Sequence, residues 1–188
     1  MTAVAKQMER VVNGVNVEDV MTLVGAIQAS PELAGSRFRL TNKWISGGYN
    51  QSRISGFYSG GEEHEHLEEF VLAADEPPVL AGHDQGANPV EQLLSALAAC
   101  LTTAMVYHAA VRGIEIRSLE SSVEGDIDLR GFLGLSGDVR RGFENIRVSF
   151  RVDTDPENIG TLEELMKFSP VFDTASNGTN VGVTVAAM

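Results

Sequence analysis

The most constraining feature of the sequence is a long uncharged stretch, residues 93–111, in the middle of the chain. Strong signals for a helix start precede it: Asn88 is a good N-cap, Pro89 suits the first helical position, and Glu91 can complete a capping box. A glycine directly after the stretch supplies a C-terminal stop. We therefore predict a single helix over residues 89–112.

This stretch is long enough to cross a bilayer. However, it is rich in alanine, it contains Ser95, Thr102 and His108, and strand-like segments of a globular kind flank it. We therefore expect a helix buried on nearly all sides in a soluble core rather than a membrane span. One small sheet can hardly cover such a helix, and its small residues would permit close packing against the same helix of a second copy.

The apolar patterns around this helix predict the remaining elements. Before it, we predict a helix over 17–29 and strands over 38–46, 53–58 and 67–74, with Gly-Gly turns at 47–48 and 60–61. After it, we predict a β region over 114–129, a strand over 146–152 and a helix after Asp155-Pro156 that Pro170 interrupts near its end. A final strand contains Val181, Val183 and Val185. Three strands joined by short glycine turns predict an antiparallel meander. Because regular βαβ alternation is absent, the order favours the α+β class.

Charge and cysteine usage exclude several classes of function. The formal net charge is -12, and no basic stripe offsets it, so nucleic acid and anionic membranes are poor partners. The one cysteine, Cys100, excludes an intrachain disulfide and a multi-cysteine metal site. The N-terminal residues lack the apolar run of a signal peptide. Together these features favour a reducing cytoplasm.

Two segments resemble a known family. Residues 88–101, NPVEQLLSALAACL, resemble the cysteine-helix motif of the OsmC/Ohr family, and residues 168–171, FSPV, resemble its second cysteine motif. The similarity extends from about residue 38 to the C-terminus. It implies an N-terminal helical extension over 1–37 and an OsmC-like domain over 38–188. It also implies an intertwined homodimer, with antiparallel sheets wrapped around long central helices and active sites at the dimer interface.

The resemblance implies a redox activity. Typical members reduce organic or inorganic hydroperoxides: one cysteine attacks the peroxide as a thiolate and becomes a sulfenic acid. A second cysteine resolves it as a disulfide, and an external dithiol reduces that disulfide. The resemblance matches Cys100 to the attacking cysteine, Arg53 to an assisting arginine, and Glu91 to an assisting glutamate.

The sequence departs from this pattern at two positions. Ser169 stands where the second cysteine is expected, and serine cannot form a disulfide. Val90 follows the motif proline directly, where the Ohr branch has its glutamate, and Glu91 comes one residue later. The internal two-cysteine cycle is therefore impossible, and the chain resembles the single-cysteine members of the family.

Each site residue also has an explanation without catalysis. Cys100 could be a small buried hydrophobe, Arg53 a solvated strand residue, and Glu91 a helix cap alone. Because Cys100 lies several turns into the helix, a thiolate there needs a cation from elsewhere, and Arg53 is the proposed source. Ser169 is either a passive replacement or a hydrogen-bond donor that could stabilise a sulfenate.

The histidines give little support for a metal site or a catalytic base. His64 and His66 would share one face of a strand, but histidines beside exposed acids at a turn are usually surface residues, so we expect no metal. His108 lies eight residues from Cys100, about 12 Å along the helix, so it is a core or interface residue rather than a base for the thiol.

The leading hypothesis is therefore a thiol protein that reduces hydroperoxides through Cys100 and depends on an external thiol reductant. The alternative is a non-catalytic protein that binds a small apolar ligand in a pocket at the dimer interface. A structural dimer without an active site is the third possibility. Because the sequence has no nucleotide-binding glycine motif and no metal cluster, we expect no cofactor.

Overall fold

The computed structural model describes residues 10–187, and its chain forms two compact units. The first unit contains Arg10 and residues 16–93, and the second contains residues 11–15 and 94–187. Helices and open antiparallel sheets occur together, which confirms the α+β class.

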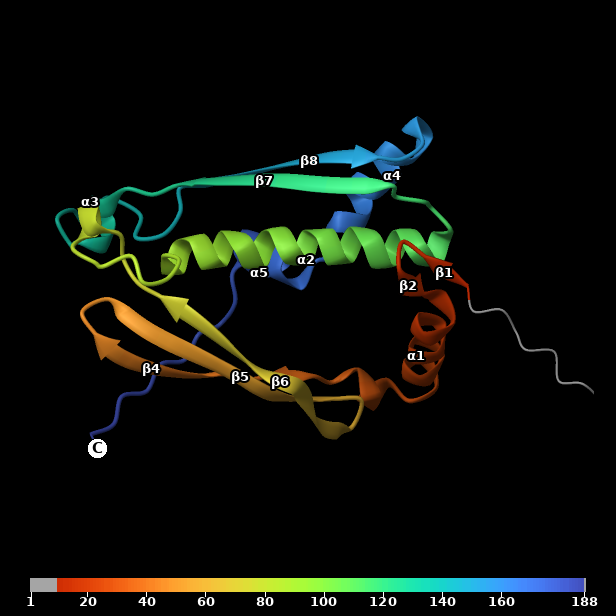
Figure 1. The fold of residues 1–188 in the computed structure, drawn as a ribbon, viewed down its shortest axis with the longest axis horizontal. Coiled ribbons are helices and arrows are strands. Elements are labelled where there is room, and N and C mark those ends of the chain that lie inside the picture. Colours follow the sequence, from red (N-terminus) through yellow and green to blue (C-terminus); the bar gives the residue numbers. More distant parts are fainter. Residues whose placement is uncertain (1–9, 188) are drawn as a thin grey trace, which may run out of the picture. The chain divides into compact units, whose positions relative to one another are not determined.

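The sheet of the first unit is built around one long strand, β5 (Tyr49–Ser59). One edge of β5 pairs with β3 (Arg37–Phe38) and β4 (Thr41–Ser46), and the other edge pairs with β6 (Glu62–Ala74), always antiparallel (Figure 1). The turns at residues 47–48 and 60–61 contain glycines with positive φ, as tight hairpins require. The predicted meander is confirmed, although the first strand is interrupted at residues 39–40.

The helix of the first unit, α1 (Val17–Ala29), begins where its sequence predicts. The side chain of Asn16 accepts hydrogen bonds from the backbone N–H groups of Glu18 and Asp19. A short 3₁₀ helix, η1 (Pro31–Ala34), follows it.

Several large apolar side chains of the first unit's sheet are exposed, among them Phe38, Trp44, Leu67 and Phe70.

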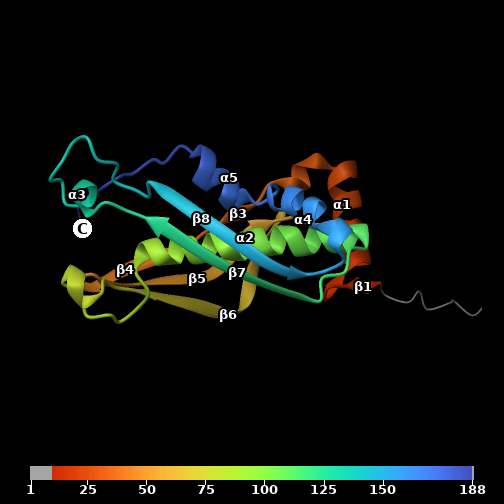
Figure 2. The ribbon, with the colours of Figure 1, turned by 90° about the horizontal axis from the view of Figure 1, so that it is seen from above.

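The sheet of the second unit is a two-stranded ribbon. Strand β7 (Ser118–Asp126) pairs with β8 (Asn145–Asp153) in unbroken antiparallel register. Side chains of β8 alternate between exposed and half-buried, so the ribbon has one polar and one apolar face. Figure 2 shows this ribbon crossing the long helix α2 (Pro89–Arg112). The apolar face covers a core formed by Met105, Ala109, Leu162 and Leu165.

Helix α2 has the predicted bounds, and Gly113 follows it with φ of 72°. Its buried stripe, Leu97, Leu101, Met105 and Ala109, repeats every four residues. On another side of the helix, Ser95, Ala99, Thr103 and Tyr107 are exposed among the described residues and form its open face, so the predicted burial on nearly all sides does not occur there. The helix is long and apolar enough to cross a membrane, as the core helices of soluble proteins also are.

The prediction for the C-terminal region is wrong in two places. Pro170 does not interrupt the preceding helix, α4 (Ile159–Met166): it is the first residue of a new helix, α5 (Pro170–Asn177), because Ser169 caps it. The predicted final strand is absent from the described residues, and its three valines are 79%, 83% and 91% exposed. A strand needs a partner for its backbone, and no described segment of the chain supplies one here.

The β region after α2 is shorter than predicted. It begins only at Ser118 and ends at Asp126, and the last predicted residue, Leu129, begins a short helix, α3 (Leu129–Phe132). Asp128 accounts for this change, because its side chain accepts a hydrogen bond from the N–H group of Arg130 and caps that helix.

The loop between β6 and α2 is organised by a buried carboxylate. Asp75 is fully buried and accepts hydrogen bonds from the backbone N–H groups of Glu76, His83 and Gln85, at 2.8, 3.2 and 3.2 Å. The loop ends at Asn88, so these bonds fix the segment that leads into the long helix.

Acid should weaken this loop. Burial raises the pKa of Asp75, but the three backbone donors lower it by more, so its pKa lies below the ordinary 3.8. A carboxyl group whose pKa is lowered in the folded state stabilises the protein at pH values above the pKa that the group has in the unfolded chain. This contribution is lost as the pH falls through the pKa of the folded state. Asp75→Asn should therefore lower stability at neutral pH and flatten the acid limb of the unfolding free energy below about pH 4.

Urea denaturation across that pH range measures this effect, with Asp138→Asn at an exposed loop as the matched control. A profile for Asp75→Asn parallel to that of the unaltered protein would contradict the structural role of the carboxylate.

Candidate functional site around the central helix

The only cysteine lies at the edge of the buried stripe of α2. Cys100 is half-buried and precedes Leu101, which is 4% exposed. Successive residues of a helix are about 100° apart around its axis, so the thiol points to the side of the core rather than into it. Its side chain is therefore accessible in part to small molecules, unlike that of its neighbour.

An apolar hollow of about 300 Å³ adjoins this part of α2 within the second unit. It is lined by Leu101, Ile146, Val148, Phe150, Glu163, Met166, Lys167 and Phe172. Most of these side chains are apolar, so the hollow suits a ligand with little polar surface.

Ser169, at the position of the second cysteine, has a local structural role. It is 1% exposed, and its hydroxyl oxygen accepts a hydrogen bond of 3.1 Å from the backbone N–H of Phe172. This bond makes Ser169 the N-cap of α5. The serine is thus explained by helix capping, and it adds no second redox group.

Arg53 lies on β5 and forms an ion pair with Glu69 of β6. Both side chains are about half exposed, at 52% and 41%. The pair is diagonal, because Arg53 stands opposite Val71, two residues after Glu69. The sequence did not reveal Glu69 because a β-bulge between Ile54 and Gly56 shifts the register of the two strands.

Glu91 completes the predicted capping box. The backbone N–H of Asn88 donates to its carboxylate at 2.9 Å, and the N–H of Val90 donates to the side-chain oxygen of Asn88 at 2.9 Å. Capping therefore accounts for Glu91 without catalysis.

The four predicted site residues divide between the two units. Arg53 and Glu91 belong to the first unit, and Cys100 and Ser169 belong to the second. Within its own unit, each of Arg53, Glu91 and Ser169 already has a defined partner. Their joint role at one site remains a prediction.

The histidines pack against aromatic rings. His64 and His66 both lie against Phe57, with ring centroids 5.2 and 5.1 Å apart, so they share one face of the sheet as expected. His108 stacks on Phe168 at 4.4 Å. Burial, and then the charge of Arg112, lower the pKa of His108 below its ordinary 6.5. His108 is therefore neutral at pH 7.

Two comparisons with solved structures show which fold this is. An OsmC-like protein from Mycoplasma pneumoniae is 18% identical, with a TM-score of 0.56 over 80% of this chain and 96% of that chain. The Legionella pneumophila structure described as an organic hydroperoxide resistance protein OsmC is 15% identical, with a TM-score of 0.51 over 75% of this chain and 91% of that chain. At these identities the likeness concerns the fold alone.

The sequence comparisons address the family. A search of the curated proteins found no match. The family model for OsmC-like proteins matches residues 82–184, more than half of the chain, and this range includes the helix with Cys100 and the segment with Ser169. The chain belongs to the OsmC-like protein family.

Proposed function

We propose that the protein is a single-cysteine thiol peroxidase that reduces organic hydroperoxides through Cys100. The observation that carries this proposal is the position of Cys100: it lies half-buried in the family's helix, and the next residue, Leu101, lines an apolar hollow. The hydroperoxide-resistance description of the Legionella relative supports the same class of substrate.

The first step transfers one oxygen atom. The Cys100 thiolate attacks one peroxide oxygen of ROOH, the O–O bond breaks, and the sulfur becomes a sulfenic acid. The departing alkoxide takes up a proton and leaves as an alcohol. Arg53 supplies positive charge for the thiolate and for the developing alkoxide, and to do so its guanidinium gives up or shares its contact with Glu69.

Recovery of the thiol needs an external reductant because Ser169 cannot resolve the sulfenic acid. One external thiol attacks the sulfenic sulfur, releases water and forms a mixed disulfide. A second thiol then attacks the external sulfur, leaves with it as a disulfide and releases Cys100 as a thiolate. The electrons therefore come from a small thiol or a protein dithiol.

Cys100→Ser should abolish consumption of cumene hydroperoxide, and Arg53→Ala should slow oxidation of Cys100 by about tenfold or more, because it removes the stabilising charge. Intact mass and a sulfenate trap follow the oxidation after mixing, with hydrogen peroxide as the second oxidant. Arg39→Ala is the matched control, because Arg39 is also an exposed arginine of the first unit that pairs with a glutamate, Glu63.

Two results would contradict the proposal, the first for the peroxidase activity and the second for the role of Arg53. One is oxidation of Cys100 no faster than that of free cysteine. The other is an equal effect of Arg53→Ala and Arg39→Ala, which would show that the role assigned to Arg53 is not specific.

The proposal includes a soluble homodimer in the cytoplasm, with no bound cofactor and with residues 1–37 as an extension of the family domain. The apolar side chains exposed on the first unit's sheet and the open face of α2 support a second copy, which would cover them. Light scattering with size-exclusion chromatography measures the mass. A monomer at micromolar concentration would overturn this part of the proposal.

A second candidate function is the binding of a small apolar ligand without catalysis. The apolar hollow beside Leu101 favours it, because about 300 Å³ can enclose a compact apolar molecule. Native mass spectrometry of the freshly purified protein tests it. A bound lipid-like species together with an unreactive Cys100 would support binding over catalysis, and a ligand-free protein with a fast thiol would reject it.

A further inference from the structure

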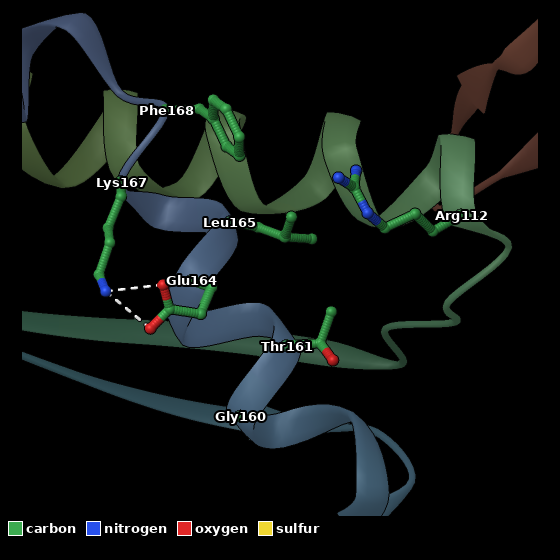
Figure 3. A pocket seen from close by; sticks show the side chains of 7 residues that line it. All are labelled: Arg112, Gly160, Thr161, Glu164, Leu165, Lys167 and Phe168. Atoms are coloured by element: carbon green, nitrogen blue, oxygen red, sulfur yellow. Dashed lines mark hydrogen bonds and ion pairs between the residues drawn. The ribbon is translucent and has the colours of Figure 1, made fainter.

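A second, larger pocket lies in the second unit, between the end of α2 and helix α4. Figure 3 shows this pocket, whose volume is about 520 Å³. The side chains that matter for its chemistry are Arg112, Thr161, Glu164, Leu165, Lys167 and Phe168. Lys167 also lines the apolar hollow near Leu101, but none of these residues is one of the proposed catalytic residues.

The pocket contains one positive charge without a compensating carboxylate. Lys167 contacts both carboxylate oxygens of Glu164 at 2.7 Å, so these two charges cancel. Figure 3 shows the Glu164 carboxylate turned toward Lys167, while the side chain of Arg112 runs along α2 with its guanidinium on the side of Phe168. Within residues 10–187, Arg112 forms no ion pair. A lone cation beside apolar walls favours an anionic ligand.

The guanidinium of Arg112 is held in place by His108, one turn earlier on α2. Its Nη1 donates to the backbone carbonyl of His108 at 3.0 Å and lies 3.4 Å from Nδ1 of the same residue. This anchor uses one nitrogen, and among residues 10–187 neither Nε nor Nη2 forms a hydrogen bond, so both can serve a ligand. A planar guanidinium fork with two available donors matches a carboxylate group.

The walls of the pocket suit an apolar body. Leu165 is 3% exposed and belongs to the core, so it forms a rigid floor. The ring of Phe168 is 61% exposed, and its stack on His108 fixes it on one side. A flat apolar group could therefore lie between a fixed aromatic face and an aliphatic floor.

We propose that this pocket binds a small organic monocarboxylate: the carboxylate pairs with Arg112, and the apolar body lies against Leu165 and Phe168. The hydroxyl of Thr161 offers a further hydrogen bond at the rim. Arg112 lies twelve residues beyond Cys100, about 18 Å along the helix axis, so this site is separate from the thiol and does not depend on the peroxidase proposal.

Benzoate and its uncharged analogue benzamide test the site by calorimetry or ligand-detected NMR on the full chain. Benzoate should bind saturably, with a dissociation constant of about 1 mM or below, as expected for so small a ligand. Benzamide should bind about tenfold more weakly, because it lacks the charge. Arg112→Gln should weaken benzoate binding by about tenfold or more, because it removes the ion pair.

Arg117→Gln is the matched control, because Arg117 is another arginine of the second unit but is already paired with Asp153 and Asp155. It should bind benzoate as the unaltered protein does, and so should Cys100→Ser. Phe168→Ala, which removes the wall, should also weaken binding and provides an independent variant if Arg112→Gln does not fold. Absence of benzoate binding, equal binding of benzamide, or unchanged binding by a folded Arg112→Gln or Phe168→Ala variant would overturn the proposal.

Discussion

Met105→Ala is expected to lower the free energy of unfolding by about 2–5 kcal/mol. Met105 is 1% exposed and lies at the centre of the second unit's core with Ala109, Leu162 and Leu165. Truncation removes buried apolar surface and leaves a cavity, because α2 and α4 cannot both close around alanine. The loss should be large because so few residues form this core.

Urea denaturation followed by far-UV circular dichroism measures the effect of Met105→Ala. The matched control is Met21→Ala, because Met21 is also a helical methionine but is 47% exposed on α1. The control should change the free energy by about 0.5 kcal/mol or less. Equal effects of the two substitutions would show that Met105 is not the centre of a packed core.

Local signals predicted the central helix well. The cap at Asn88, the capping-box carboxylate at Glu91 and the stop at Gly113 act within a few residues of the helix ends, so the sequence contains them directly. The meander was predicted for the same reason, since its turns depend on neighbouring glycines. The resemblance around Cys100 then led to the family, which the match over residues 82–184 confirms.

The errors arose where the structure depends on distant partners. Alternating valines near residue 183 have the pattern of a strand, but alternation does not show whether another strand is available. The partner of Arg53 was missed because cross-strand register, including the bulge after Ile54, is not visible in the sequence. Pro170 has the pattern of a helix breaker, but a proline also suits the first position of a new helix, which the cap at Ser169 provides here.

Gly82→Ala is expected to destabilise the loop before α2 by about 3 kcal/mol. A Cβ atom at Gly82 would lie 1.8 Å from the carbonyl oxygen of Glu76, with the other nearest atoms also in the Glu76 backbone. Backbone cannot move aside as a flexible side chain can. The same carbonyl accepts a hydrogen bond from Asp84 N–H at 3.1 Å, so a displacement would break this bond too.

The matched control for Gly82→Ala is Gly25→Ala in the same unit. Gly25 lies inside α1, and an added methyl group there would meet no atom within 4 Å apart from the adjacent backbone of its own helix, so alanine should stabilise the helix by about 0.5–1 kcal/mol through its better helix propensity. The two substitutions are chemically identical, and only the surroundings of the added methyl group differ. Opposite shifts in urea denaturation would therefore establish the close approach of Gly82 to Glu76, whereas a stable Gly82→Ala variant would show that the loop does not hold this conformation.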